Sequence, residues 1–500
     1  MRYLLSLLCV FLATATLGFA EETKTTPKPL FVTVDLNCGE SRTVTLPDGE
    51  KVTVKLTGIK EYRDKVRGVL RGADVAVDVS TPKSRGSGII GCATYHLPVE
   101  LVGVRIDCPV VKGYVDGSSG GNVWAIERDA RLRIWPKTGP LIQPGTFGYP
   151  VRQCWGAAGT QFDNEIGDAE LSNSSKKVYY HQGFDFGGSD GLTPVVAATD
   201  GVVVSVGKKA LKGLPKVIKP RYDVVYLRDG RGWYYRYSHL DSIDKKVQLG
   251  KRVTLGQKLG VLGKEGTSGG WAHLHFELIR KQNNGKYGSD SVYAFLHQVY
   301  QADHDQPVVA VAGPRLLVDV DEPVVLDGHR SWSKLGKTGI AEYRWTFDDG
   351  TTVVGPKVQH VFRKGGSYRP ILKVTDADGN VDYDFAVVTV SDPKVPAEKR
   401  CYLHASYWPT EKIRPGDEVT FLVRSFRFRP TVGDEVWDFG DGTPKVTTRS
   451  DGCVEYHTKP GYAEVKHRFA KPGLYIVTVR RENGNGQTAV CRLDVRVEAE

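Results

Sequence analysis

Long apolar runs are absent from almost the whole chain. After residue 20, no apolar stretch approaches the roughly 20 residues that a membrane-spanning helix needs, so we expect no stable membrane insertion. Seven of the eight cysteines follow residue 20, and no two of them have the CxxC spacing of a thiolate zinc site. The net charge is +10, but the basic residues are spread along the chain without the interleaved aromatic residues that bind single-stranded nucleic acid. We therefore expect no nucleic-acid partner.

The first 20 residues have the pattern of a secretory signal peptide. A short basic start is followed by an almost wholly apolar stretch over 4–17, and Gly18 and Ala20 supply the small residues that a signal peptidase requires. We expect cleavage after Ala20. The sequence therefore predicts an exported protein that resides in the periplasm, at the cell surface or outside the cell.

An oxidising compartment makes the cysteines of the mature chain candidates for disulfide bonds. They form two groups, one before residue 155 and one near the C-terminal end: Cys38, Cys92, Cys108 and Cys154, and Cys401, Cys453 and Cys491. The first group has the right number for two bonds, whereas the second leaves one thiol unpaired. The sequence does not determine the pairing.

A chain of 500 residues is too long for one core, and its patterns indicate mainly β domains. Apolar and polar residues alternate over 42–59 around the hairpin signal Asp48-Gly49, and similar segments follow. We expect an N-terminal β domain over 21–145, for which the sequence indicates no role. Residues 146–301 are rich in glycine and short apolar runs, which predicts a compact antiparallel β-sheet domain with a closing helix over 291–301.

Two related segments follow the linker at 302–307 and form an internal repeat. Each copy contains Trp-x-Phe, then Asp-Gly, then His-x-Phe and Gly-x-Tyr. The paired positions are Trp345 and Trp437, Phe347 and Phe439, His360 and His467, and Tyr368 and Tyr475. Trp and Phe two residues apart lie on one side of a strand, which is typical of a sandwich core.

The repeats resemble polycystic-kidney-disease (PKD) domains, which implies an immunoglobulin-like β-sandwich over 305–391 and another over 396–498. We refer to these segments as the first and the second repeat. Because His360 and His467 belong to the repeat motif, we interpret both as structural. We expect each repeat to fold alone and to act as a spacer or as a module that targets substrate.

Between residues 179 and 278, histidine and aspartate occur at spacings that can bring their side chains together. His273 and His275 are two residues apart in a strand pattern, so their side chains point to the same face. His181 and Asp185 are four apart, and they can meet only if the chain bends between them, which Gly183 permits.

A further histidine, His239, ends an aromatic strand pattern over 235–239. Nitrogen and oxygen ligands without thiolate suit zinc, and a catalytic zinc takes three protein ligands and keeps one open position. Four histidines and one aspartate compete for three places, which leaves two histidines for acid–base work. The residues alone do not decide which these are.

The ordered motifs His-x-x-x-Asp, Tyr-x-His-Leu and Gly-x-x-His-x-His-Phe-Glu resemble those of the lysostaphin-type zinc endopeptidases over about 175–285. The resemblance implies that His181, Asp185 and His275 bind Zn²⁺ and that His239 and His273 are catalytic. Two departures are expected at the rim of the cleft. The segment 207–223 is longer and more basic than the family's hairpin turn, and Trp271-Ala272 replaces a Gly-Pro pair.

The sequence thus predicts an exported zinc endopeptidase that hydrolyses peptide bonds of bacterial peptidoglycan with zinc-activated water. One alternative is a secreted zinc protease with extracellular protein as its substrate. Another is a wall-binding protein that has a peptidase-like fold and no activity. The sequence does not determine which bond is cleaved or the oligomeric state.

Overall fold

The computed structural model describes residues 26–92, 95–167, 177–336, 338–395, 400–429, 431–484 and 486–499. Strands dominate this part of the chain, which confirms the predicted mainly β fold. The two helices described are α1 (Lys112–Gly117) and α2 (Tyr293–His304). Neither helix is long and apolar enough to cross a membrane. The predicted signal peptide at 1–20 lies outside the described residues.

The N-terminal sheet has eight strands in the order β1-β8-β7-β5-β4-β3-β2, with β6 paired to β7. Its strands are β1 (Val32–Leu36), β2 (Ser41–Thr45), β3 (Lys51–Arg63), β4 (Leu70–Ser80), β5 (Arg85–Cys92), β6 (Val99–Leu101), β7 (Val104–Val111) and β8 (Ala130–Pro136). The predicted hairpin joins β2 to β3, and Gly49 in its turn has a φ of 90°. Val52, Val54 and Leu56 alternate into the core, as the sequence pattern predicts.

The central sheet is antiparallel throughout and runs β13-β12-β14-β15-β19-β10-β9, with β17 and β20 attached to its side. Its strands are β9 (Thr160–Gln161), β10 (Phe184–Gly187), β12 (Gly201–Val206), β13 (Lys209–Ala210), β14 (Val225–Arg228), β15 (Tyr234–Ser238), β17 (Arg252–Val253), β19 (His273–Lys281) and β20 (Tyr287–Asp290). A smaller sheet contains β11 (Pro194–Val196), β18 (Lys258–Leu262) and β16 (Leu240–Ile243). Leu274, Phe276 and Leu278 of β19 are fully buried on the core side.

The first repeat contains β21 (Val308–Val309), β22 (Leu316–Asp319), β23 (Pro323–Asp327), β24 (Trp332–Ser333), β25 (Ile340–Thr346), β26 (Thr352–Val354), β27 (Lys357–Val361), β28 (Gly366–Tyr368), β29 (Ile371–Asp376), β30 (Val381–Phe385) and β31 (Val388–Ser391). The second contains β32 (Tyr402–Trp408), β33 (Val419–Phe426), β34 (Glu435–Asp438), β35 (Val446–Thr448), β36 (Ala463–His467), β37 (Gly473–Glu482) and β38 (Thr488–Val497). The Trp-x-Phe residues of both copies are buried in the repeat cores. His360 stacks on Phe347 at 3.7 Å and His467 on Phe439 at 3.9 Å, so both histidines belong to the sandwich framework.

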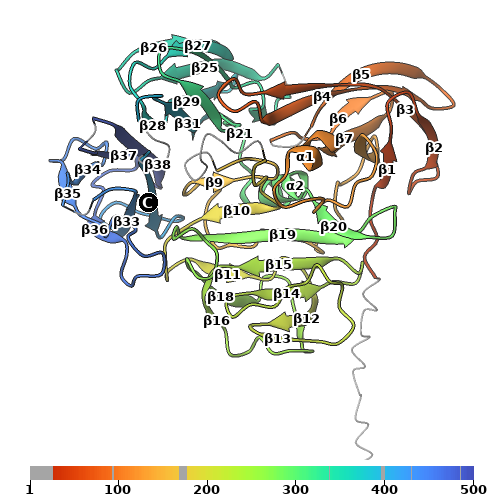
Figure 1. The fold of residues 1–500 in the computed structure, drawn as a ribbon, viewed down its shortest axis with the longest axis horizontal. Helices are drawn as coiled ribbons and strands as arrows, with labels where there is room; N and C mark the ends of the chain where they lie inside the picture. The colour runs from red at the N-terminus through yellow and green to blue at the C-terminus, as the bar shows by residue number, and fades with distance from the viewer. Residues whose placement is uncertain are drawn as a thin grey trace, which may run out of the picture.

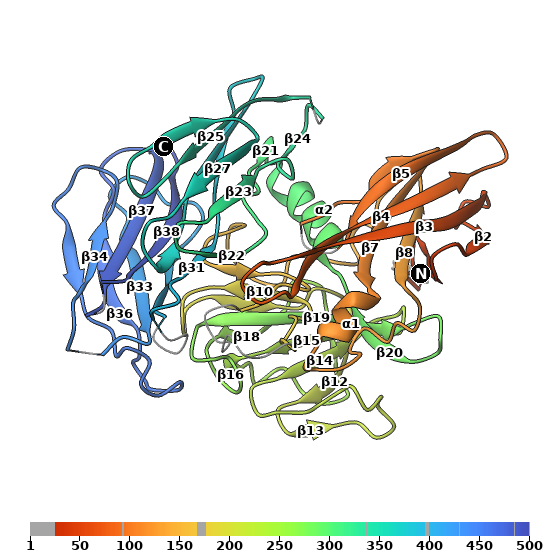
Figure 2. The ribbon, with the colours of Figure 1, turned by 45° about the horizontal axis from the view of Figure 1, so that its top comes forward.

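The two repeats share one sheet, which the sequence did not predict. Strand β28 of the first repeat pairs in parallel with β38 of the second, with Gly366 opposite Thr488. The result is a seven-stranded sheet in the order β22-β31-β28-β38-β37-β34-β35. Figures 1 and 2 show the repeats side by side, with the second one next to the start of β19. Their apolar cores are separate, and independent folding of each repeat remains a prediction.

No disulfide bond joins the cysteines in the part of the chain that the structure describes. Cys92 on β5 and Cys108 on β7 lie opposite each other in the parallel bridge between these strands, and both are buried. The expected disulfide bonds therefore remain a prediction, and Cys92 with Cys108 is the pair that this register favours.

Buried arginines join the N-terminal sheet to the central part of the chain. Arg133 on β8 is 1 % exposed. Its guanidinium contacts Asp107 at 2.9 and 2.5 Å, and it donates to the Ser291 carbonyl at 2.7 Å. Burial lowers the pKa of Arg133, but Asp107 and Asp290 outweigh this effect and raise it. The arginine is therefore charged, and its partners depend on it.

We expect Arg133→Ala to lower the free energy of unfolding by about 3–5 kcal/mol, because it leaves the buried Asp107 carboxylate without its cation, whereas Asp290 keeps Arg280. Urea unfolding followed by tryptophan fluorescence measures this change. The matched control is Arg363→Ala, since Arg363 pairs with Asp321 at the surface with side chains 75 % and 63 % exposed. Equal unfolding midpoints for the two variants would contradict the expectation.

Candidate active site

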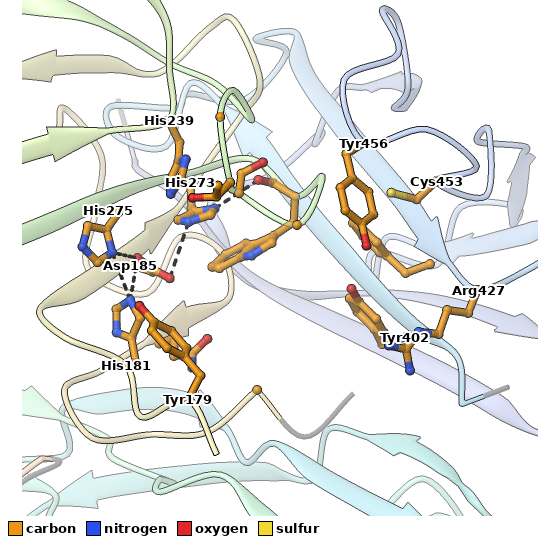
Figure 3. Close-up of a pocket in the computed structure, with 18 of the residues that line it drawn as sticks. Tyr179, His181, Asp185, His239, His273, His275, Tyr402, Arg427, Cys453 and Tyr456 are labelled. Atoms are coloured by element: carbon orange, nitrogen blue, oxygen red, sulfur yellow. Dashed lines mark hydrogen bonds and ion pairs between the residues drawn. The ribbon is translucent and has the colours of Figure 1, made fainter. Parts of the chain in front are cut away.

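Three buried side chains converge on one face of the central sheet. Asp185 on β10 and His275 on β19 are direct partners in the antiparallel register, and His181 lies just before β10. His181 Nε2 is 3.0 Å from Asp185 Oδ1 and 3.1 Å from His275 Nδ1. His275 Nδ1 is 2.9 Å from the same Asp185 oxygen. Figure 3 shows the three side chains pointing toward one another.

Gly183 allows His181 to reach Asp185. Its φ is 80°, in the left-handed region that favours glycine. A Cβ at this position would lie 2.3 Å from the carbonyl oxygen of Phe276, so no other residue fits without movement of β19. Its N–H donates to Asp163 Oδ1 at 2.6 Å, which holds the bend in place. The bend predicted from the four-residue spacing is present.

The donor set fits a metal ion such as zinc. One ligand atom from each residue lies within 4.8 Å of the other two, and all are nitrogen or carboxylate oxygen. Neighbouring ligands of a tetrahedral zinc with bonds of about 2.1 Å are about 3.4 Å apart. The observed separations of 2.9–3.1 Å are close to this value.

The electrostatics of the three side chains also favour a cation. Burial raises the pKa of Asp185, but the charges of His181 and His273 and hydrogen bonds outweigh it and lower the pKa well below its usual range. Burial lowers the pKa of His181, but Asp185 more than offsets this and the net shift is upward. A buried carboxylate that remains ionised needs positive charge beside it, which a metal ion supplies.

Three further side chains contact His275 or residues that position the donors. Glu277, two residues after His275 on the same face of β19, places Oε2 3.7 Å from His275 Nε2. Arg236 lies 3.5 Å from the same oxygen. Burial raises the pKa of Asp163, the partner of Gly183, to about 7. Sequence reasoning assigned no role to these residues; the Glu of His-Phe-Glu was the available signal for Glu277.

His239 and His273 form a second pair next to the donors. Their ring centroids are 4.5 Å apart, and His273 Nε2 lies 3.5 Å from Asp185 Oδ2. His273 Nδ1 is 3.0 Å from the Trp271 carbonyl, and His239 Nδ1 is 2.6 Å from the Glu265 carbonyl. A carbonyl oxygen only accepts, so these contacts favour the tautomer with a proton on Nδ1 and the lone pair on Nε2. Arg221 Nη2 also lies 3.2 Å from His239 Nδ1.

Both histidines are held in the neutral form. Burial and the charges of nearby histidines lower the pKa of His273 to about 4, although Asp185 opposes the shift. Burial, His273 and His275 lower the pKa of His239 well below its usual value. Neutral imidazoles at neutral pH can accept a proton, as a general base requires.

The long segment 207–223 ends beside His239 and orients it. Asp223 Oδ2 accepts from the His239 backbone N–H at 2.9 Å, and Arg221 pairs with Asp223 at 2.5 and 2.6 Å. The φ of His239 is 69°, an uncommon value for a residue other than glycine. The predicted departure from the usual hairpin therefore contacts a site residue, and the roles of Arg221 and Asp223 were missed.

These five side chains lie in a cavity of about 1130 Å³. Trp271 lines it and stacks on His273 with ring centroids 3.8 Å apart and planes at 15°. The opposite side consists of residues from the second repeat, among them Tyr402, Arg427 and Tyr456. Figure 3 shows these residues facing the His181–Asp185–His275 group across the cavity.

Comparison with known families supports the predicted organisation. Residues 179–287 match peptidase family M23. Residues 304–390 and residues 404–495 each match the PKD domain. The chain therefore carries an M23 peptidase domain followed by two PKD domains, as the motifs predicted.

Similarity to solved structures is low. Helicobacter pylori Csd3 in its hexagonal crystal form is 11% identical over 55% of this chain and 79% of its own, with a TM-score of 0.20. The fibronectin(III)-like modules of Clostridium thermocellum CbhA are 12% identical over 38% of this chain and 94% of theirs, with a TM-score of 0.16. Dimeric latent PorU from Porphyromonas gingivalis is 11% identical over 60% of this chain and 32% of its own, with a TM-score of 0.18.

Metal analysis of purified variants tests the donor set. We expect His181→Ala and His275→Ala to lose stoichiometric zinc, because each removes one of three converging ligands. His239→Ala and His273→Ala should retain it. Zinc bound at a ratio of one in His181→Ala would show that the ion lies elsewhere.

Glu277→Gln should weaken zinc binding about 10–100-fold, since a carboxylate behind a ligating histidine fixes its orientation and raises its basicity. Competition with a chromogenic chelator gives the dissociation constant. Glu127→Gln, which changes a carboxylate with a side chain 54 % exposed, serves as the control. An unchanged constant in Glu277→Gln would exclude this role.

Proposed function

We propose that this chain is an exported zinc endopeptidase that hydrolyses peptide bonds in bacterial peptidoglycan. The observation that carries the proposal is the His181–Asp185–His275 group at the bottom of an accessible cavity, with two neutral histidines beside it. The match to family M23 supports a peptidase. The PKD domains support a location outside the cell or at its surface.

In this proposal His181, Asp185 and His275 hold the zinc ion. Bound zinc polarises the scissile carbonyl and lowers the pKa of a water molecule. The low exposure of the three donors, 3–5 %, keeps bulk water from competing for them. Glu277 and Arg236 restrict the ring of His275, so the donor atoms are already in place before substrate binds.

His273 and His239 handle protons at their Nε2 atoms. Because each Nδ1–H is donated to a backbone carbonyl, the tautomer and the ring plane are fixed. His273 Nε2 faces Asp185, where it can accept a proton from the attacking water. His239 packs beside it, and its Nε2 can share this proton; the ring that has taken the proton then returns it to the leaving amine.

Two alternatives remain distinguishable by experiment. A secreted zinc protease acting on extracellular protein would use the same five residues. A wall-binding protein without activity would have no need for a complete donor set and two histidines in fixed tautomers. The presence of all five side chains at one site favours an enzyme.

Mass spectrometry of fragments released from purified peptidoglycan tests the proposal. The wild-type chain should release peptide fragments with new amino termini, and a chelator should stop the release until zinc is restored. His239→Ala and His273→Ala should each lose activity about 10²–10⁴-fold because a positioned proton-handling group is gone.

His329→Ala is the control, because His329 lies in the first repeat with a side chain 60 % exposed and should leave the release unchanged. Faster cleavage of an unfolded protein than of peptidoglycan would favour the protease alternative. A zinc-loaded wild-type chain that cleaves neither substrate would favour the wall-binding alternative.

A further inference from the structure

The second PKD domain forms one wall of the peptidase cavity. Its strands β32 and β33 and the loop at 452–456 supply lining residues, whereas the M23 domain supplies the metal-site side. Tyr402, at the start of β32, stacks on Phe426 at the end of β33 with centroids 4.4 Å apart and planes at 5°. Tyr456 is 58 % exposed. The wall thus presents aromatic surface opposite the candidate metal site (Figure 3).

Two cations and one carboxylate are found among the described residues that line the cavity. Arg236 pairs with Glu277 at 3.5 Å and Asp185 is a proposed zinc ligand, so Arg427 is the cation on the wall that faces the metal site. Arg427 follows β33 with a φ of 61°, an uncommon conformation that turns the chain at the wall. Figure 3 shows its side chain extending beside Tyr402. Such a surface suits an anionic ligand with flat apolar faces.

We propose that the second PKD domain supplies a substrate subsite, in which Arg427 pairs with a carboxylate of the peptide substrate beyond the scissile bond. Tyr402 and Tyr456 pack against the groups next to that carboxylate. This inference rests on the proposed peptidase function and adds the chemical class of the substrate, a peptide that carries free carboxylates.

The wall is fixed to the M23 domain rather than loosely placed beside it. Arg424 of β33, buried at its side chain, donates to the Gly270 carbonyl at 2.5 Å. The same guanidinium binds Asp451 at 2.9 and 2.7 Å and donates to the Tyr456 carbonyl at 2.8 Å. One arginine therefore ties the loop that carries Tyr456 to the loop that precedes His273.

Kinetics with a matched pair of substrates tests the subsite. The zinc-loaded full chain is given a soluble cross-linked stem peptide and the same peptide with its carboxylates converted to amides. We expect the wild-type KM to be about 10–100-fold lower for the acid, as a hydrogen bond to a charged group implies. Arg427→Gln should bring the ratio of the two KM values close to one.

Arg429→Gln is the matched control, because Arg429 is exposed two residues further along and is not among the residues lining the cavity. It should keep the wild-type ratio. The subsite is refuted if wild type prefers neither peptide, or if Arg427→Gln keeps the preference.

If wild type cleaves neither peptide, the proposed function fails, and equilibrium dialysis with the same two peptides still decides the subsite. Equal affinities for acid and amide, or a preference that survives Arg427→Gln, would overturn it.

A separate observation concerns the orientation of His273. The residues on both sides of Trp271 are held by the second PKD domain, since Gly270 is bound by Arg424 and the Ala272 N–H donates to the Tyr462 hydroxyl at 2.7 Å. Trp271 stacks on His273, and its carbonyl accepts from His273 Nδ1. We infer that Tyr462 is a positioning residue that acts on His273 through Trp271.

Tyr462→Phe removes one hydroxyl and tests this role. We expect kcat to fall about 10–100-fold through misplacement of His273, with KM, zinc content and the unfolding midpoint near wild type. Tyr407→Phe is the control, because it removes a buried hydroxyl of the same domain that donates to the Asp494 carbonyl at 2.7 Å. A kcat in Tyr462→Phe equal to that of the control would refute the inference.

Discussion

The pairing of β10 with β19 is the constraint on which the rest of the site depends. In this register Asp185 lies opposite His275 and Gly187 opposite His273, while Phe186 and Phe276 face the core. A slip of one residue would exchange the two faces of β19 and bury both histidines in the apolar core. The fully buried phenylalanines prevent this slip, so the packing of the core fixes which side chains lie on the opposite face of the sheet. Gly183 then brings His181 to the same point, because only a residue without Cβ fits against Phe276.

The sequence predicted the parts of this arrangement that local patterns encode. Alternation along β19 indicates which face His273 and His275 share, and the His181–Asp185 spacing with Gly183 between them indicates the bend. The Trp-x-Phe pairs identified both repeats for the same reason, since two residues on one strand face are neighbours whatever surrounds them. Each of these inferences spans fewer than ten residues.

The features that sequence reasoning missed are contacts between distant segments. Gly270 is held by Arg424 and Ala272 by Tyr462, across sequence separations of 154 and 190 residues. No periodicity marks such partners, and a buried arginine cannot be distinguished from a surface one by its neighbours in sequence.

The pairing of β28 with β38 was missed for a related reason. It depends on a close approach at Gly366, where a Cβ would lie 2.4 Å from the Thr488 carbonyl oxygen, and a lone glycine in a strand pattern indicates a bulge or a bend just as readily.

These long-range contacts change what the PKD domains contribute. A spacer would need only a flexible attachment, but here Lys459 of the second PKD domain also pairs with Asp241 and Glu265 of the M23 domain at 2.6 and 3.3 Å. Glu265 is the residue whose carbonyl accepts from His239. The second PKD domain therefore contacts the loops that orient both neutral histidines, through Glu265 on one side and through Trp271 on the other. Because the same domain provides the far wall of the cavity, any displacement of it would alter the shape of the cleft and the placement of His239 and His273 together. The proposed subsite and the two histidines proposed to handle protons thus meet at one interface between domains, which is where ligand sites in multidomain proteins are commonly built.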